Sequence, residues 1–212
     1  MSARTGRPSH PSRIVRSRDP VDLPAIEPLM PDQRADAFNH PDWLFEPKYD
    51  GIRALAYVTP SNCSFASPRN APLDRASELL LALPGQVNAR DAILDGEIVA
   101  LDRHGRPSRR ELSRSGSAVA FAVFDLLWLN GRDLRGLPLT RRKRLLDLAV
   151  PANTAHLMKV LSIQGDGVAL FKATEKLDLE GIVAKRRDGA YDNTAQWFAM
   201  RNPAYSQAPG RR

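Results

Sequence analysis

The chain has 212 residues, of which 42% are apolar and 26% are charged, and its formal net charge is +7. This composition supports a globular protein with a hydrophobic core. The single cysteine, Cys63, excludes an internal disulfide framework and gives little support to a cysteine-based zinc site. The first 26 residues lack the apolar core of a secretory signal, and no apolar run is long enough to span a bilayer, so the sequence predicts a cytoplasmic protein without a membrane partner.

The positive charge suggests a polyanionic partner, such as nucleic acid, or an anionic substrate. Five arginines and no acidic residue lie in residues 1–18, so the rest of the chain carries only about +2. A solvated basic tail explains the charge equally well. We expect a flexible basic arm at 1–22, one folded domain at 23–207 and a tail at 208–212.

The expected elements begin with a proline-rich, extended segment at 23–31. Strand-like patterns follow at 42–49 and 52–58, and the second has alternating apolar residues on one face. The Asp50-Gly51 turn between them predicts a β-hairpin.

Two apolar runs, 92–102 and 118–129, are short, rich in β-branched or aromatic residues and bounded by turn residues. These features favour buried strands over helices. The polar, arginine-rich stretch between them, 103–117, is expected to be a loop.

Helical patterns are expected at three places, and each has a recognisable start or stop signal. Pro84 ends the first, whereas Thr140 and Asp166 are the expected N-caps of the second and third. These helices cover 74–83, 141–150 and 167–179, and further strands are expected at 63–67, 181–187 and 196–202. Antiparallel strand neighbours with a few helices outside them indicate an α+β fold.

Three charged residues, Lys48, Glu97 and Lys185, lie in or beside otherwise apolar strands. A charge in such a strand is costly unless it reaches a cleft or a partner. The three side chains could converge on one hydrated cleft, or each could face solvent on the outer side of its strand.

Lys48 is chemically distinctive because the chain holds six lysines against twenty-five arginines. An ammonium can lose its proton and become a nucleophile, whereas a guanidinium effectively cannot. Glu46 and Asp50 favour the ammonium, so nucleophilic use requires a compensating divalent cation or another cation such as Lys185. Other lysines are expected on helix surfaces, at Lys143, Lys172 and Lys176.

Acidic residues follow or interrupt apolar runs at Asp95, Glu97 and Glu180. Carboxylate oxygens of this kind are suitable ligands for Mg²⁺ or Mn²⁺ that also binds substrate phosphates. Asp-Gly and Glu-Gly are also ordinary turn dipeptides, which is the alternative explanation.

Arg53, Arg69 and Arg201 are candidates for phosphate or ribose contacts, because the guanidinium presents a planar set of donors. Phe124 belongs to an aromatic run, most of which must be core, although one ring could face a flat base. Trp197 is expected to be a packing anchor.

Five segments, taken in order, resemble the adenylation (nucleotidyltransferase) domain of ATP-dependent DNA ligases, especially those of bacterial end joining. The resemblance extends from about Leu23 to Gln207 and implies an ATP-grasp-like domain of antiparallel sheets flanked by helices, with ATP between them. The segments are "EPKYDGIR", "SPRNAPL", "LDGEIV", "FAVFDLLWLNGRDLRGLPLTRRKRLL" and "EGIVAKR".

The resemblance implies that Lys48 attacks the α-phosphate of ATP and carries AMP as a phosphoramidate while pyrophosphate leaves. It implies that Glu46 holds the adenine edge, Glu97 contacts the ribose or the metal ion, and Phe124 stacks on adenine. Full ligases then transfer AMP to the 5′-phosphate of a DNA nick, which the 3′-hydroxyl attacks.

The same resemblance implies that Arg53 and Arg69 contact the nucleotide or the DNA 5′-phosphate. It also implies that Glu180 binds the metal ion and that Lys185 neutralises the α-phosphate. The expected partners are nicked or broken duplex DNA and a separate OB-fold or end-joining protein.

Two features depart from the family pattern. The motif W-x-K-x-K reads "WFAMR" here, so Ala199 replaces one lysine and Arg201 the other. Loss of one contact to a phosphate in the transition state costs about 2–4 kcal/mol, or roughly a hundredfold in rate. The sequence also ends at Arg212, before the OB-fold domain into which ligases continue, so we expect complete nick sealing to need that domain.

These departures leave an alternative, a catalytically degenerate module that binds nucleotide or DNA. An RNA ligase or capping-type transferase is disfavoured because the segment "GRDLRGLPL" is close to that of DNA ligases.

Overall fold

The computed structural model describes residues 14–15, 23–68, 73, 76–103, 105–114 and 116–208. Most of the expected basic arm, the end of the expected tail and Arg69 lie outside these residues. No helix in the described part of the chain is both long enough and apolar enough to cross a membrane.

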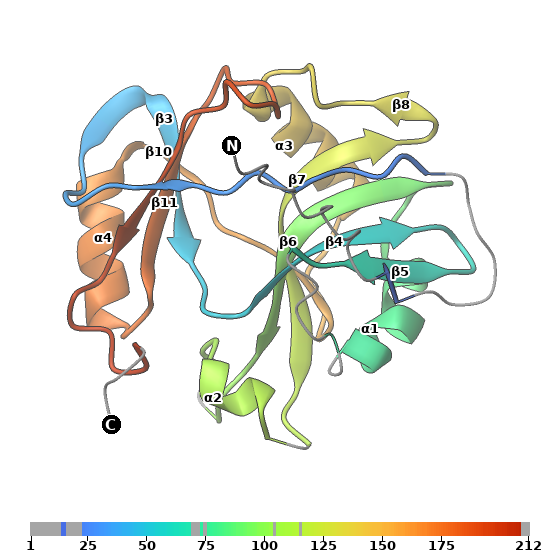
Figure 1. The fold of residues 1–212 in the computed structure, drawn as a ribbon, viewed down its shortest axis with the longest axis horizontal. Coiled ribbons are helices and arrows are strands. Elements are labelled where there is room, and N and C mark those ends of the chain that lie inside the picture. The colour runs from blue at the N-terminus through green and yellow to red at the C-terminus, as the bar shows by residue number, and fades with distance from the viewer. Residues whose placement is uncertain are drawn as a thin grey trace, which may run out of the picture.

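Two sheets form the body of the molecule (Figure 1). The larger sheet has seven strands in the order β1-β5-β4-β6-β7-β8, with β9 paired to β7. Its strands are β1 (Ile14–Val15), β4 (Ile52–Val58), β5 (Cys63–Ala66), β6 (Ala92–Ala100), β7 (Val119–Leu129), β8 (Arg132–Asp133) and β9 (Leu157–Lys159).

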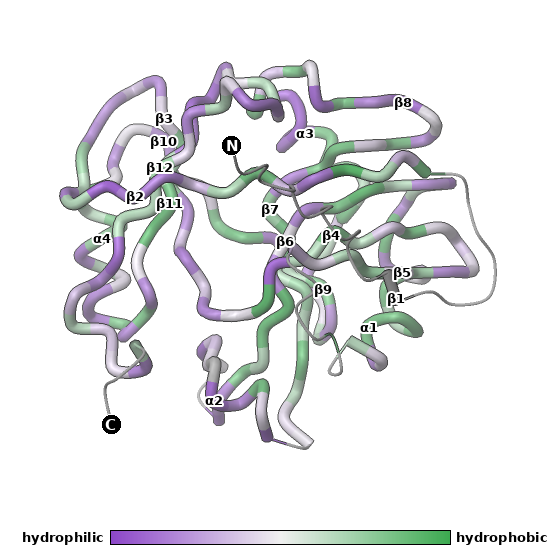
Figure 2. Tube along the Cα trace, viewed as in Figure 1, coloured by the Kyte–Doolittle hydropathy of each residue, from purple (hydrophilic) through white to green (hydrophobic). Residues whose placement is uncertain are grey.

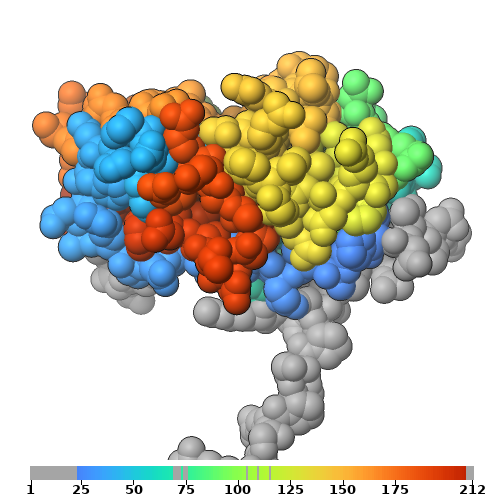
Figure 3. All heavy atoms as spheres, turned by 90° about the horizontal axis from the view of Figure 1, so that it is seen from above, coloured from blue at the N-terminus to red at the C-terminus, as the bar shows by residue number. Residues whose placement is uncertain are grey.

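The smaller sheet has five strands in the order β10-β3-β11-β12-β2. Its strands are β2 (Asp32–Gln33), β3 (Asn39–Lys48), β10 (Ile163–Asp166), β11 (Gly181–Arg186) and β12 (Trp197–Arg201). Viewed from above, the red segment near the C-terminus lies directly against the yellow segment that precedes helix α3 (Leu139–Ala149) (Figure 3). Hydrogen bonds across this contact include Tyr191 N–H to the Arg135 carbonyl at 2.7 Å.

Helices cover the outer faces of both sheets. Leu79, Leu83 and Leu146 pack into the main core of the larger sheet, and Leu170 packs on the smaller sheet. The helices are α1 (Ser77–Ala82) with its 3₁₀ continuation η3 (Leu83–Gln86), α2 (Arg109–Leu112), α3 (Leu139–Ala149) and α4 (Gly167–Lys176). The central strand β6 is largely hydrophobic (Figure 2). Its polar residues are Asp95 and Glu97.

The structure confirms the α+β class and the two buried strands, since β6 and β7 have almost no exposed residues. It also confirms Asp166 as the N-cap of α4, because its Oδ1 accepts a hydrogen bond from Ala169 N at 3.1 Å. Pro84 was expected to end the first helix. The α-helix α1 ends at Ala82, and the chain continues around Pro84 as the 3₁₀ helix η3.

The predicted hairpin at Asp50-Gly51 is wrong. β3 pairs with β10 and β11, whereas β4 pairs with β5 and β6, so the chain turns here and crosses from one sheet to the other. Gly51 packs on the backbone of Ile98, where any side chain would clash. The turn residues therefore bring the end of β3 against β6, which places Lys48 between the two sheets.

Two smaller predictions also need correction. Thr140 lies inside α3 rather than capping it, because the first N–H groups of the helix donate to the carbonyls of Arg187 and Gly189 at 3.0 Å. The expected loop at 103–117 contains α2, whose Leu112 reaches the main core.

Candidate active site

The register of the smaller sheet places the candidate residues on one face. Side chains of directly paired residues in antiparallel strands project to the same side. Lys48 pairs with Gly181, which pairs with Arg201, so these three form one row across β3, β11 and β12. Parallel rows are Glu46–Val183–Ala199 and Leu44–Lys185–Trp197.

Glu180 joins the two cations of the first row. Lys48 Nζ donates to Glu180 Oε2 at 2.6 Å, and Arg201 Nη1 lies 3.5 Å from Glu180 Oε1. Gly181 adopts φ +141°, and its Cα faces the backbone of Met200 so closely that no side chain would fit. This close strand contact holds the adjacent Glu180 beside Lys48. The Lys48 side chain is 22% exposed, so its amine remains accessible.

The larger sheet supplies the opposite wall. Arg53 on β4 and Glu97 on β6 are directly paired and project to the same side. Arg53 donates to both oxygens of the fully buried Asp95, at 2.7 and 2.8 Å, and to the Leu29 carbonyl at 3.0 Å. Tyr191 O–H also donates to Asp95, at 2.7 Å. Arg53 is therefore held in a fixed orientation.

Glu97 is half-buried among charged neighbours of both signs. Burial raises the pKa of Glu97 to about 7, although Arg53 and Lys48 act in the opposite direction. A carboxyl group in this range gains from a cationic ligand, because a bound cation stabilises its ionised form.

Two adjoining cavities separate the walls. The larger, about 720 Å³, is lined by residues that include Asp50, Glu97 and Glu180. The smaller, about 180 Å³, is lined by residues that include Phe124, Val183 and Trp197. Both are lined by Met30, Lys48, Arg53, Glu97 and Arg201. The combined space has the size of a small-molecule site, with Lys48 where the two parts meet.

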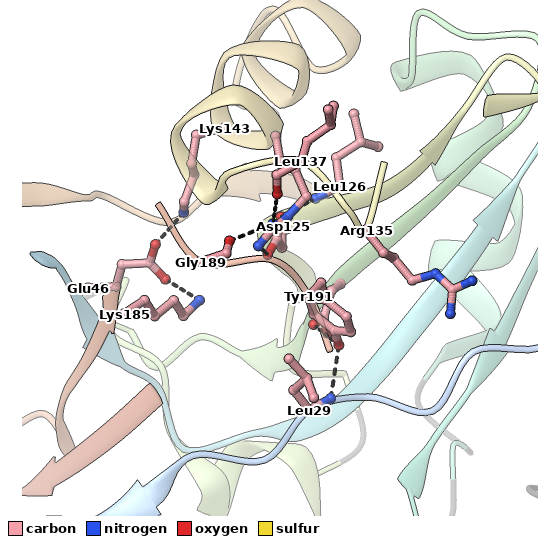
Figure 4. A network of polar contacts seen from close by, with 12 residues as sticks. Leu29, Glu46, Asp125, Leu126, Arg135, Leu137, Lys143, Lys185, Gly189 and Tyr191 are labelled. Carbon is pink, nitrogen blue, oxygen red and sulfur yellow. Dashed lines mark hydrogen bonds and ion pairs between the residues drawn. The ribbon is translucent and has the colours of Figure 1, made fainter. Parts of the chain in front are cut away.

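The inner end of the smaller cavity holds Glu46 and Lys185, each only 2% exposed. Lys185 Nζ donates to Glu46 Oε2 at 2.6 Å and lies 3.9 Å from the ring centre of Phe124 and 4.2 Å from that of Trp197. Burial lowers the pKa of Lys185 to about 8, although Glu46 raises it. Lys143 on α3 forms an ion pair with the other oxygen of Glu46 (Figure 4).

The structure brings together every candidate site residue that it describes. Lys48, Arg53, Glu97, Glu180 and Arg201 surround the larger cavity, and the remaining three line the smaller one. These three are Glu46, Phe124 and Lys185. Arg69 lies outside the described residues.

Lys185 does not lie in the row of Lys48. It is four residues farther along β11 than Gly181, the residue opposite Lys48, which is roughly 13 Å at the rise of a strand. Its amine points to Glu46 and to the rings of Phe124 and Trp197. Phe124 likewise has cations near its ring, with the Arg53 guanidinium 4.6 Å from its centre.

Sequence reasoning missed two features of the site. Asp95, considered above as an oxygen ligand for a metal ion, is instead bound by Arg53 and Tyr191. Lys143, expected on a helix surface, is only 15% exposed and reaches Glu46. No local signal could have identified these partners, because they lie far apart in the chain.

Glu97 and Glu180 both line the larger cavity and provide hard oxygen donors beside Lys48. This donor set fits a divalent cation such as Mg²⁺, which takes one or two carboxylates and completes its shell with water and phosphate oxygens.

Comparisons with known proteins match the chain to one domain family. The family model described as "ATP dependent DNA ligase domain" matches residues 30–200. The chain is 34% identical over 151 residues to the multifunctional non-homologous end joining protein LigD of Mycobacterium bovis, covering 70% of this chain and 20% of LigD. It is 24% identical over 193 residues to the SPbeta prophage-derived DNA ligase-like protein LigB of Bacillus subtilis, covering 86% of this chain and 69% of LigB.

A solved structure described as mycobacterial DNA ligase D complexed with ATP and MES has a TM-score of 0.73 and 28% identity. The match covers 82% of this chain and 60% of that one. The chain thus has a nucleotidyltransferase fold of the kind found in the LigD ligase domain, and it spans about a fifth of the length of the LigD relatives.

Proposed function

The chain belongs to the ATP-dependent DNA ligase domain family, and we propose that it uses ATP to form a covalent lysyl-AMP intermediate at Lys48. The observation that supports this most is the placement of Lys48, whose amine lies where the two cavities meet, 2.6 Å from Glu180. This position gives an incoming α-phosphate direct access to the amine.

In the proposed step the neutral amine of Lys48 attacks the α-phosphorus of ATP. A nitrogen–phosphorus bond forms, the bond from the α-phosphorus to the bridging oxygen of the β-phosphate breaks, and pyrophosphate leaves. Glu180, which accepts the hydrogen bond from Lys48, is placed to take the proton. Positioning and charge neutralisation are the main contributions that a protein makes to such a transfer.

Glu97 and Glu180 would hold Mg²⁺ or Mn²⁺, which neutralises phosphate oxygens and disfavours a second positive charge beside it. Arg201, which is 57% exposed at the edge of the larger cavity, is the residue that we propose clamps the phosphates. Arg53 has its Nε and Nη2 committed to Asp95 and Leu29, so any contact with nucleotide falls to Nη1.

The base would occupy the smaller cavity. Phe124, Val183 and Trp197 supply apolar surface there, and Glu46 and Lys185 supply an acceptor and a donor at its inner end. Stacking of adenine on the face of Phe124 that meets Lys185 would require that amine to move, because it lies 3.9 Å from the ring centre. We therefore propose that Lys185 contacts the base rather than the α-phosphate.

We propose nicked or broken duplex DNA as the final acceptor of AMP. The support is the family and the LigD relatives, whose descriptions name non-homologous end joining. The chain spans about a fifth of the length of those relatives. We therefore also propose, as part of this function, that the complete joining reaction involves a separate OB-fold or end-joining protein.

The experiment is incubation of the purified protein with ATP labelled at the α-phosphate, with Mg²⁺ and, separately, with Mn²⁺. The wild-type chain is expected to acquire a covalent label, and Lys48→Ala and Lys48→Arg are expected to acquire none. Lys159→Ala is a matched control, because Lys159 is 24% exposed and pairs with Asp147, much as Lys48 is 22% exposed and pairs with Glu180. A wild-type chain that stays unlabelled with either metal would contradict the proposal.

A second candidate is a module that binds nucleotide or DNA without catalysis. Ala199 favours it, because this residue lies in the row of Glu46 and Val183 and brings no charge to the cavity face. It predicts an unlabelled wild-type chain whose salt-sensitive DNA binding survives Lys48→Ala.

A further inference from the structure

Lys143 makes a buried contact that its local sequence does not indicate. It lies on α3, next to Arg142, whose side chain is completely buried against Asp125. Its own side chain turns toward the smaller sheet and forms an ion pair with Glu46 Oε1, while Lys185 binds Oε2 of the same carboxylate (Figure 4). Two lysines from different elements therefore share one buried carboxylate.

The two contacts are not equivalent. Lys185 donates a hydrogen bond to Glu46 and also lines the cavity. Neither Lys143 Nζ nor Glu46 Oε1 makes a hydrogen bond with another group in the described ranges, although both atoms are buried. Lys143 thus holds Glu46 from behind the cavity wall, and Lys185 holds it from the cavity side.

The second lysine lowers the free-energy cost of moving Lys185 away from Glu46. A buried carboxylate with a single cationic partner cannot release it without becoming an uncompensated buried charge, which is strongly unfavourable. With Lys143 in place, Glu46 keeps one cation when the other turns away. Lys185 can then donate to a ligand in the cavity, and Glu46 remains ionised as an acceptor beside it.

We propose that Lys143 is a positioning residue for nucleotide binding: it keeps Glu46 paired so that Lys185 is free to bind the base of ATP. The inference rests on the proposed function, since it takes ATP as the ligand. It assigns Lys143 no contact with ATP, because this residue does not line the cavity.

The electrostatics of the cluster agree with this role. Burial raises the pKa of Glu46, but attraction by Lys143 and Lys185 outweighs it and holds the pKa below its usual range. The charged groups with the largest effect on Lys185 are Glu46 on β3, Lys143 on α3 and Asp125 on β7. Arg53 on β4 lies against the same two aromatic rings that Lys185 contacts. Among the first three groups Lys143 alone repels the ammonium of Lys185, so removing Lys143 raises the pKa of Lys185 from its value of about 8.

The test compares Lys143→Met and Lys143→Arg with the wild-type chain and with Arg144→Met, a control at the next, exposed position of α3. The readout is the Kd of a non-hydrolysable ATP analogue, measured by calorimetry from pH 7 to 10. We expect Lys143→Met to weaken binding at pH 7 by about tenfold, and Lys143→Arg to restore most of the loss. Thermal unfolding shows whether each variant is folded.

The pH profile separates positioning from a purely structural role. If protonated Lys185 binds the nucleotide, affinity is lost as pH rises through the pKa of Lys185. Lys143→Met should move this alkaline loss to higher pH, whereas a space-filling role would weaken binding equally at every pH. An unchanged Kd, an unshifted alkaline limb or no rescue by Lys143→Arg in a folded protein would each overturn the inference.

Failure of the proposed function gives a different result. If the wild-type chain binds the analogue but is never labelled by ATP, lysyl-AMP formation is wrong, and the Kd values still decide the role of Lys143. If the wild-type chain does not bind the analogue, both proposals are wrong.

Discussion

The two sheets carry ion pairs of different kinds. On the larger sheet, Arg142 of α3 forms a completely buried pair with Asp125 of β7, with both guanidinium contacts at 2.9 Å, and Arg53 binds Asp95 in the same two-pronged manner. At the cavity wall of the smaller sheet, the lysine pairs are single contacts, and Glu180 divides its charge between Lys48 and Arg201.

The difference separates scaffold from reactive groups. In a bidentate arginine–carboxylate pair both groups have their hydrogen bonds satisfied. Separating the two groups costs much free energy once the pair is buried. A lysine presents a single movable charge that can exchange partners and can lose its proton. A charged side chain is therefore not by itself a sign of function in this protein. The better sign is a charged side chain that is accessible and held by a single contact.

The largest expected effect breaks the scaffold side of this contrast. Arg142→Met leaves Asp125 buried without its cation, and we expect the free energy of unfolding to fall by about 3–5 kcal/mol. Denaturant unfolding measures this loss. A change below about 1 kcal/mol would show that the buried pair is not a main structural contact.

Glu180→Gln tests the reactive side. It keeps the shape of the side chain but removes the charge that faces Lys48 and a metal ion, so we expect the rate of lysyl-AMP formation to fall roughly a hundredfold. The free energy of unfolding should change by only about 1 kcal/mol, because both partners retain access to water. Single-turnover labelling at several Mg²⁺ concentrations measures the rate, and full activity at low Mg²⁺ would contradict a metal-binding role.

Ala199→Lys asks whether the reactive side lacks a cation. The new side chain would project from the row of Glu46 and Val183 toward the cavity. If a missing phosphate contact limits the reaction, labelling should become about tenfold faster. Ala199→Met is the size control, and an equal rate for both variants would place the limit elsewhere.

The smallest expected effect concerns a pair outside both classes. Arg135 and Asp133 contact each other at 2.7 Å, but their side chains are 39% and 43% exposed. We expect Arg135→Met to change the free energy of unfolding by no more than about 0.5 kcal/mol and to leave labelling unchanged. A larger loss would mean that exposure does not divide structural from incidental pairs in this chain.

Local sequence patterns predicted most of the elements. β6 and β7 follow from continuous apolar runs. The N-cap of α4 follows from Asp166, which lies three residues before Ala169 and accepts a hydrogen bond from its N–H group. Patterns failed where a distant segment supplies the partner. Thr140 is not a cap because the carbonyls of Arg187 and Gly189 already satisfy the start of α3.

The sequence by itself determined the family, the α+β class and the set of candidate side chains, because motifs and hydrophobic periodicity are properties of neighbouring residues. Only the tertiary structure decided which charged side chains are paired, and with which partners. Asp95 is bound by Arg53 and Tyr191, and Lys143 reaches Glu46, because strand register and helix packing bring together residues that are far apart in the chain. The turn at Asp50-Gly51 shows the same division, since its residues specify a reversal of the chain but not which sheet receives the next strand.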